Sequence, residues 1–394
     1  MIILTIIIIL VTIILIFIKP GELFARVRDS SRYSNLRNIE SSINQFQTDS
    51  PNGFLGTSTN IYISLPDSSA TCSSWLNKLP QLINNFSYHC VSADNLALNN
   101  GNGWIPVNLN SDPLINFTLP VDPKNSPNHY YTYVVTPTNN YEVVAIPENN
   151  FQPAINDGGL DPALFEVGTD NSYYDPGLTI DWNFHDGTGT SASSAYKFNQ
   201  DVGSFKTASS TCGSNCYPQW TTSNCPKNCL FFNGTSTQSY VESSNLYNYC
   251  SGFTFSAWVY PYSVNSTGVI ITSGGYKDQI MKQSNNMLFG NVYDNYLPST
   301  LQGSAFNQPN QWYFVTFTFD AKTLLAGLYV NGVQIASNVL GNGYGYCVGN
   351  DIVGTGTQDA GGSGSFYGLI DNVKIYNYAL SADQIKSLYQ GENL

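Results

Sequence analysis

The sequence predicts an α+β N-terminal part, a long hydrophobic helix with a small antiparallel β head, followed by an all-β sandwich. Residues 1–18 contain only Thr5 and Thr12 as polar side chains, and an amphipathic pattern continues from them to about residue 50. From Gly177 onward, short alternating strands are separated by glycine-containing turns. We therefore expect three regions: a helix over 1–50, a β head with a linker over 51–176, and a β sandwich over 177–394.

The composition excludes some classes of function. The 394 residues carry 15 Lys and Arg against 27 Asp and Glu, a net charge of −12, so the chain lacks the electrostatic basis for binding nucleic acid. Only 11% of residues are charged, whereas 14% are aromatic and 33 are glycine. Strands favour aromatic residues and their turns favour glycine, so we expect an ordered, β-rich, extracellular chain.

The apolar segment 1–18 is long enough to cross a membrane. As a helix it spans about 27 Å, close to the thickness of a bilayer's hydrocarbon core. No cleavage site of small residues comes after it, because the segment runs into Lys19 and Pro20. The cations beyond the segment favour a cytoplasmic location for the rest of the chain, whereas the cysteines favour an oxidising one. A basic leader before Met1, or burial of the segment in a helical polymer, would resolve this conflict.

The helical region continues beyond Pro20. Leu36, Ile39, Ile43 and Phe46 succeed one another at spacings of 3, 4 and 3, and the pattern stops before Pro51. The run IKPGELFARVRDSSRYSNLRNIESSI resembles the N-terminal helix of type IV pilins and type II secretion pseudopilins, although the family's early acidic residue has no counterpart. The resemblance implies a subunit that is anchored in the inner membrane before assembly and then buries its helix in a filament. An ordinary signal-anchor helix is the alternative.

The β head resembles pseudopilin heads as far as about Asp170. NIYISLP, CSSW, YHC, YYTYVVT and YEVVAIPE occur in the same order as in those heads. Cys72 and Cys90 can close a disulfide there. Some pseudopilin heads hold calcium in a C-terminal loop, where Asp157, Asp161 or Asp170 would supply ligands; solvated turn carboxylates are the favoured interpretation.

The last region has the pattern of stacked sheets. In WYFVTFTFD both faces carry apolar bulk, and Asn331 with Gly332 predicts a two-residue hairpin turn. FTFSAWVYP, LYVNG and GLIDNVKIYNYALSADQI resemble the laminin G-like, concanavalin A-type jelly roll. The resemblance implies lectin-like binding and a structural calcium at Asp181 and Asp371. Alternatively, Asp371 only caps backbone donors.

Eight cysteines favour disulfides in an oxidising compartment. For the CGSNC and CPKNC segments we expect a nested pairing of Cys212 with Cys229 and Cys216 with Cys225; zinc is the alternative. The two remaining cysteines, Cys250 and Cys347, would then form a disulfide with each other.

No catalytic constellation occurs in the sequence. The E-x-D-x-E run of related glucanases is absent, and His89, His129 and His185 lie in separate segments. The chain is therefore expected to be a binding protein and not an enzyme. Sugar recognition requires exposed rings beside polar groups, and the candidates in predicted loops are Trp220, Tyr276, Asp278, Tyr293, Asp294 and Tyr296.

Together these features predict a pilin-like subunit of a cell-surface filament that displays a lectin-like adhesive domain. Its partners would be further copies of the chain, glycans or a cell surface, and the inner membrane before assembly. In a purely structural interpretation, the sandwich only stiffens the filament. A monomeric, membrane-anchored, lectin-like surface receptor is the alternative, and an unrecognised hydrolase is a third hypothesis.

Overall fold

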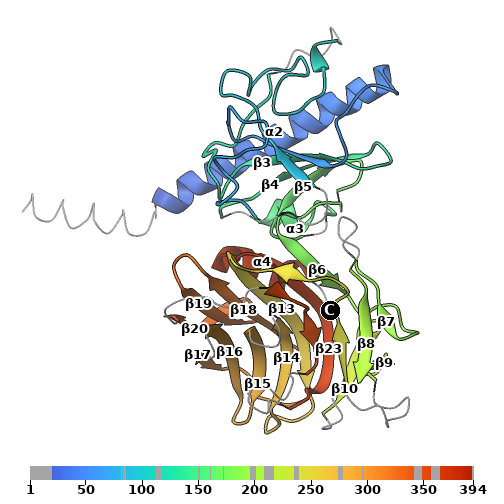
Figure 1. The fold of residues 1–394 in the computed structure, drawn as a ribbon, viewed down its shortest axis with the longest axis vertical. Coiled ribbons are helices and arrows are strands. Elements are labelled where there is room, and N and C mark those ends of the chain that lie inside the picture. Colours follow the sequence, from blue (N-terminus) through green and yellow to red (C-terminus); the bar gives the residue numbers. More distant parts are fainter. Residues whose placement is uncertain are drawn as a thin grey trace, which may run out of the picture. The chain divides into compact units, whose positions relative to one another are not determined.

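A computed structural model describes most of the chain and divides it into two compact units. The described residues are 20–80, 82, 86–111, 118–149, 151–159, 161–171, 173–195, 201–207, 217–234, 239–273, 278–294, 297–340, 348–355 and 364–392. The first unit comprises Met1–Leu79 with Asn85–Ser172, and the second comprises Pro80–Asn84 with Tyr173–Leu394. Figure 1 shows the elements of both units.

Helix α2 (Pro20–Asp49) opens the described part of the first unit. Pro20 suits the first turn of a helix, where its missing N–H leaves no hydrogen bond unmade. The predicted stripe of Leu36, Ile39, Ile43 and Phe46 is buried against the sheet, which confirms the amphipathic pattern. No helix in the described part of the chain is long and apolar enough to span a bilayer. The predicted apolar segment 1–18 lies outside the described residues.

The head of the first unit is a five-stranded sheet in the order β2-β1-β3-β4-β5. Its pairings are antiparallel except for β1 with β2, which is parallel. The elements are β1 (Asn60–Ile63), β2 (Ser87–His89), η1 (Leu109–Ser111), β3 (Tyr131–Val135), β4 (Tyr141–Ala145), α3 (Gln152–Ile155) and β5 (Phe165–Gly168). Every residue of β3 and β4 is buried, so these two strands form the centre of the head.

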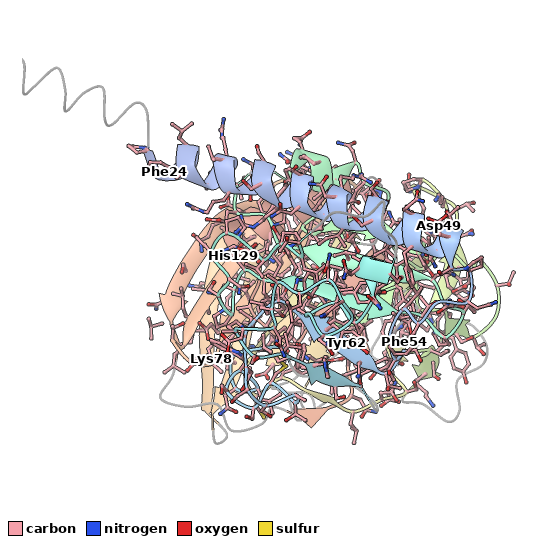
Figure 2. All side chains as sticks on the ribbon, turned by 90° about the horizontal axis from the view of Figure 1, so that it is seen from above. Phe24, Asp49, Phe54, Tyr62, Lys78 and His129 are labelled. Atoms are coloured by element: carbon pink, nitrogen blue, oxygen red, sulfur yellow. A yellow bond between two sulfur atoms is a disulfide. The ribbon has the colours of Figure 1, made fainter. Side chains whose placement is uncertain are left out.

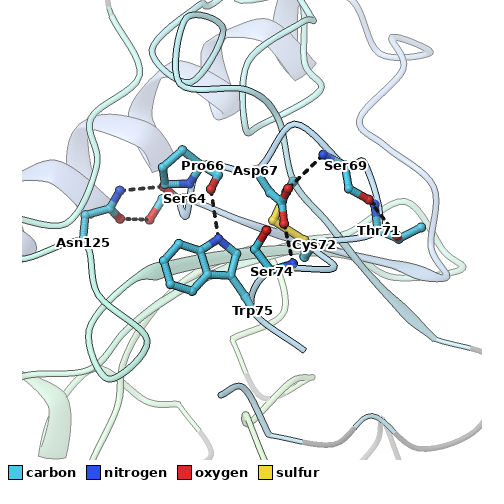
Figure 3. Close-up of a disulfide and its surroundings, with 10 residues drawn as sticks. Ser64, Pro66, Asp67, Ser69, Thr71, Cys72, Ser74, Trp75 and Asn125 are labelled. Atoms are coloured by element: carbon cyan, nitrogen blue, oxygen red, sulfur yellow. Dashed lines mark hydrogen bonds between the residues drawn. A yellow bond between two sulfur atoms is a disulfide. The ribbon is translucent and has the colours of Figure 1, made fainter. Parts of the chain in front are cut away.

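The disulfide predicted in the head is confirmed. Cys72 and Cys90 are bonded, with Cα atoms 5.2 Å apart. The loop around Cys72 is held by Asp67, which accepts backbone N–H bonds from Ser69 and Ser74, and by the Trp75 indole, which donates to the Pro66 carbonyl (Figure 3).

The second unit contains two large sheets that enclose one apolar core. The first, here called the β13 sheet, has the order β20-β19-β18-β13-β23-β10-β9, with β6 also paired to β23. The second has the order β17-β16-β15-β14-β22-β11-β8-β7, and β12 pairs separately with β21. Phe253, Phe255 and Val259 of the first sheet share the core with Ile271 and Ile280 of the second. These sheets form the predicted sandwich.

The bounds of the strands in the second unit complete the description. They are β6 (Leu178–Trp182), β7 (Ser191–Ala192), β8 (Gly203–Thr207), β9 (Gln219–Thr221), β10 (Cys229–Asn233), β11 (Ser239–Glu242), β12 (Tyr247–Asn248), β13 (Gly252–Pro261), β14 (Gly268–Ser273), β15 (Asp278–Gln283), β16 (Met287–Asp294), β17 (Leu297–Ser304), β18 (Tyr313–Asp320), β19 (Leu325–Val330), β20 (Val333–Val339), β21 (Val348–Gly349), β22 (Ile352–Val353) and β23 (Tyr367–Tyr376). Helix α4 (Ala382–Gly391) comes last, with a Ser381 capping box. The predicted hairpin turn joins β19 to β20, and Asn331 and Gly332 have φ values of 51° and 74°.

The nested pairing predicted for the extra cysteines is wrong. Cys225 is bonded to Cys229, four residues away, with Cα atoms 6.0 Å apart. The physical reason is the turn between β9 and β10: Cys225 N–H donates to the Thr222 carbonyl and Asn224 has a φ of 63°, so the chain folds back on itself. Cys250 is also disulfide-bonded. Cys212, Cys216 and Cys347 lie outside the described residues.

Candidate functional site

Among the sugar-binding candidates chosen from the sequence, only Trp220 and Asp278 have side chains that the structure describes. Asp278, Tyr293 and Asp294 lie on strands β15 and β16, not in loops as predicted. Asp278 is 1% exposed, so its side chain is not at the surface where a sugar would bind. The Trp220 indole on β9 packs on Phe205 and donates to the Gly189 carbonyl at 3.0 Å. Tyr276 and Tyr296 lie outside the described residues, as do the side chains of Tyr293 and Asp294.

A different group of rings gathers on the outer face of the β13 sheet. We call it the aromatic platform: Phe231, Tyr260, Tyr262, Trp312 and Tyr367. Strand alternation places these rings there, because the neighbours of Phe231 and Tyr260 on the opposite face, such as Phe232 and Val259, belong to the interior core. Tyr367 is 38% exposed, and the other four rings are partly exposed.

Strand register aligns the platform across the sheet. Phe231 of β10 pairs with Leu369 of β23, which pairs with Tyr260 of β13. The next pair, Val259 with Tyr313, places Trp312 beside Tyr260. Neighbouring strands lie about 4.8 Å apart, so the row from Phe231 to Trp312 extends about 14 Å. Figure 1 shows β10, β23, β13 and β18 in this order.

Tyr367 and Tyr262 form a second, parallel row. The backbone N–H of Tyr262 donates to the Tyr367 carbonyl at 3.2 Å. The two rows touch, since ring centroids are 5.7 Å apart for Phe231 and Tyr262 and 5.7 Å apart for Tyr260 and Tyr262. Within the first row, the Tyr260 and Trp312 centroids are 5.4 Å apart. Burial raises the pKa of the Tyr262 hydroxyl.

Amide side chains border the platform. Gln219 of β9 pairs with Phe231, and Asn233 of β10 pairs with Tyr367. Asn310 lies at the opposite border, where its N–H donates to the Pro261 carbonyl at 2.9 Å. Gln219 and Asn310 are exposed. Rings flanked by amides provide both a flat apolar surface and hydrogen-bonding groups, the combination that a sugar ring requires.

The turn closed by Cys225 and Cys229 adjoins this surface. The Trp312 indole Nε1 donates to the Asn224 carbonyl at 2.8 Å. Asn224 directly precedes Cys225, so the disulfide-closed turn fixes the edge of the platform.

At its other end the platform adjoins polar residues. Asp371 lies two positions beyond Leu369 on β23 and pairs with Trp258 of β13. His185 Nε2 is 3.8 Å from Asp371 Oδ2. Burial raises the pKa of Asp371, while the nearby His185 opposes that shift.

The predicted calcium pair is not brought together. Asp181 pairs across the strands with Lys374, whose Nζ lies 3.9 Å from its carboxylate and 3.4 Å from Glu392. Asp371 lies three residues along β23 from Lys374, about 10 Å of strand. Calcium needs 6–8 converging oxygen atoms, and these two carboxylates face different partners, so they do not fit a shared ion.

Two of the three acidic residues considered for calcium in the head, Asp157 and Asp161, accept hydrogen bonds from backbone groups. Asp157 accepts N–H bonds from Gly159 and Glu166, both at 2.7 Å, and burial raises its pKa to about 7. Asp161 is 1% exposed and accepts from Ala163 N–H at 2.7 Å, so it is not a solvated turn carboxylate. No group of three or more His, Cys, Asp or Glu side chains placed to hold a metal occurs among the described residues.

Sequence reasoning missed the platform, although one signal for it was present. In the run WVYPY from Trp258 to Tyr262, alternation assigns Trp258, Tyr260 and Tyr262 to the face opposite Val259. The remaining rings come from three distant segments, and only strand register brings them together.

Comparisons with known proteins concern mainly the second unit. Residues 233–386 match the family model described as the concanavalin A-like lectin/glucanases superfamily. No match was found among curated proteins. One similar solved structure is the binding domain of botulinum neurotoxin DC in complex with rat synaptotagmin II, at 13% identity and a TM-score of 0.41, covering 54% of this chain and 51% of that one. The chain thus spans about half the length of that structure.

Another similar structure is the heptameric SAP-like pentraxin from Limulus polyphemus, at 17% identity and a TM-score of 0.34, covering 40% of this chain and 78% of that one. Both TM-scores are low, so these likenesses say nothing about function. The family match and the two-sheet architecture of the second unit indicate the same fold. The chain therefore carries a laminin G-like, concanavalin A-like jelly-roll domain in its C-terminal part.

Proposed function

We propose that the protein is a pilin-like subunit of a cell-surface filament whose jelly-roll domain binds glycans through the aromatic platform. The role is adhesion without turnover. Before assembly the subunit is held in the inner membrane, and afterwards it is part of an extracellular filament.

The observation that carries the binding role is the platform itself. Five contacting rings stay partly exposed on one sheet face, although burying them would contribute to stability. Exposed contiguous aromatic surface is typical of binding sites. The amides at its borders and the family match of residues 233–386 support a sugar as the bound group.

The filament role is supported by helix α2. Its first turns expose Leu23, Phe24 and Val27, which are 52%, 62% and 57% exposed. Phe24 is labelled near the start of the helix in Figure 2. These apolar side chains come soon after the apolar segment 1–18 in the sequence, and their exposure leaves them available for packing against other copies. Many weakly binding domains on one filament would then gain attachment through avidity.

The glycan role is tested with an array of cellulose, chitin, mannan, xylan and β-glucan oligosaccharides. The full chain is compared with a Tyr260→Ala, Trp312→Ala variant. We expect at least a tenfold loss of binding, since a sugar face loses its stacking partner when a ring is removed. Phe54→Ala is the matched control, because Phe54 is a 63% exposed ring in the first unit. Equal binding by the double variant and the unaltered chain would contradict the proposal.

A further inference from the structure

Asp371 has an unusual environment at the polar end of the platform. Its Oδ1 accepts the Asn372 backbone N–H at 3.0 Å. Its Oδ2 has no hydrogen-bond partner among the residues that the structure describes, although the residue is only 1% exposed. A buried carboxylate oxygen without a hydrogen bond is costly, and such atoms usually face a water or a ligand.

Trp258 supplies a complementary donor. It pairs directly with Asp371, and both residues lie on the outer face of the β13 sheet. The Trp258 ring packs on Phe314 and Tyr389 at centroid distances of 5.4 and 5.7 Å. Its Nε1 is also buried and has no hydrogen-bond partner in the described part of the chain. A donor and an acceptor therefore remain unsatisfied on adjacent strands.

His185 adds a third group that is open to the surface. Its Nε2 lies 3.8 Å from Asp371 Oδ2, longer than a direct hydrogen bond and in the range where a bridging group is common. The His185 side chain is 28% exposed, so a ligand can approach from its side. The backbone fixes the arrangement, because the ladder shifts register between Ser256 and Trp258 and Asn372 has a φ of 45°.

We propose that Asp371, His185 and Trp258 form a subsite for one hydroxyl group of the glycan that lies on the aromatic platform, an inference that rests on the proposed function. A hydroxyl has one donor and two acceptor sites. It donates to Asp371 Oδ2 and accepts from Trp258 Nε1 and His185 Nε2, so its hydrogen-bonding capacity matches the three atoms. The Asp371 carboxylate disfavours a sulfate or carboxylate group in the same place, so the subsite selects neutral sugars.

A structural water offers the same hydrogen bonds, and the experiment separates the two occupants. Trp258→Phe removes the N–H donor and retains a ring against Phe314 and Tyr389. Trp220→Phe is the matched control, because its indole also donates one hydrogen bond, to the Gly189 carbonyl. Both full-chain variants are titrated on the oligosaccharide array described above, and their melting temperatures are recorded.

We expect Trp258→Phe to weaken binding of the recognised oligosaccharides about fivefold to tenfold, the scale of one hydrogen bond, and Trp220→Phe to leave it unchanged. Because His185 is partly exposed, His185→Ala is expected to weaken binding about threefold without affecting folding. Unchanged affinity in both Trp258→Phe and His185→Ala, with a lower melting temperature for Trp258→Phe, would indicate a structural water and overturn the inference. If the Tyr260→Ala, Trp312→Ala variant still loses binding in that case, the proposed function stands. If the unaltered chain binds none of the oligosaccharides, both the proposed function and this inference fail.

Discussion

At the scale of single residues, Asp351 shows how burial changes the chemistry of a carboxyl group. Asp351 is fully buried in the jelly-roll domain, where the Tyr249 hydroxyl donates to its Oδ2. Burial raises its pKa to about 7, although the hydrogen bond from Tyr249 opposes the shift. The folded state therefore binds the Asp351 proton more tightly than the unfolded state does.

This predicts a stability that falls as the pH rises. The contribution of Asp351 is fully present below the ordinary Asp pKa and is lost as the pH rises through about 7. It amounts to at most about 4 kcal/mol over that window. Asp351→Asn should remove this dependence, as measured by the free energy of unfolding of the jelly-roll domain within the full chain at pH 5 and pH 8.

The exposed Asp383 on α4 provides the control, because Asp383→Asn should leave the pH dependence as it is in the unaltered chain. An unchanged pH profile in the Asp351→Asn variant would assign the dependence to other groups.

At the scale of elements, helix α2 is joined to the head by buried charges as well as by its apolar stripe. Arg32 is fully buried and donates to both oxygens of Asp122, at 2.6 and 2.9 Å, and also to Asp29 and Glu148. Burial alone would raise the pKa of Glu148, but hydrogen bonds from Arg28, Lys124 and Arg32 lower it well below its usual range. These contacts fix the direction in which α2 leaves the head.

Removing the central cation should therefore weaken the docking of the helix. Arg32→Met leaves buried carboxylates without their partner, and we expect the first unit to lose about 3–5 kcal/mol of stability. Arg37→Met is the matched control on the same helix. Arg37 is exposed, pairs with Glu40 at the surface and lies 5.4 Å from the Phe165 ring, and each of these contacts is worth about 1 kcal/mol or less. Urea unfolding followed by tryptophan fluorescence measures both. Similar losses for the two variants would contradict this account of the docking.

Elements with a local pattern could be predicted, and contacts that depend on register could not. The stripe of α2 and the Asn331–Gly332 turn each depend on a few neighbouring residues, and both are present. The pairing of Cys225 with Cys229 depends on a left-handed Asn224, which spacing does not reveal. Predicting the aromatic platform would have required the strand register, in which Phe231 and Tyr260 both pair with Leu369.

At the scale of the whole molecule, the proposed function needs two independent surfaces. One is the aromatic platform of the jelly-roll domain, and the other is the exposed start of α2. Neither depends on the other, so assembly and glycan binding should be separable by substitution. Altering the aromatic platform alone should give filaments that do not bind glycans. Altering the start of α2 alone should give subunits that bind glycans but do not assemble.

The assembly surface gives the last prediction. Leu23→Asp with Phe24→Asp places two charges on side chains that are already exposed, so the subunit should fold normally and still bind glycans. In a helix-packed polymer the same charges would be buried without partners, at a cost of several kcal/mol per contact, so filaments should be lost. Ser30→Asp, also exposed on α2, is the control and should assemble. Electron microscopy of sheared surface fractions, labelled with antibodies against the jelly-roll domain, provides the measurement. Labelled fibres from the double variant would contradict helix-packed assembly, whereas label confined to membranes for the unaltered chain would favour a monomeric anchored receptor.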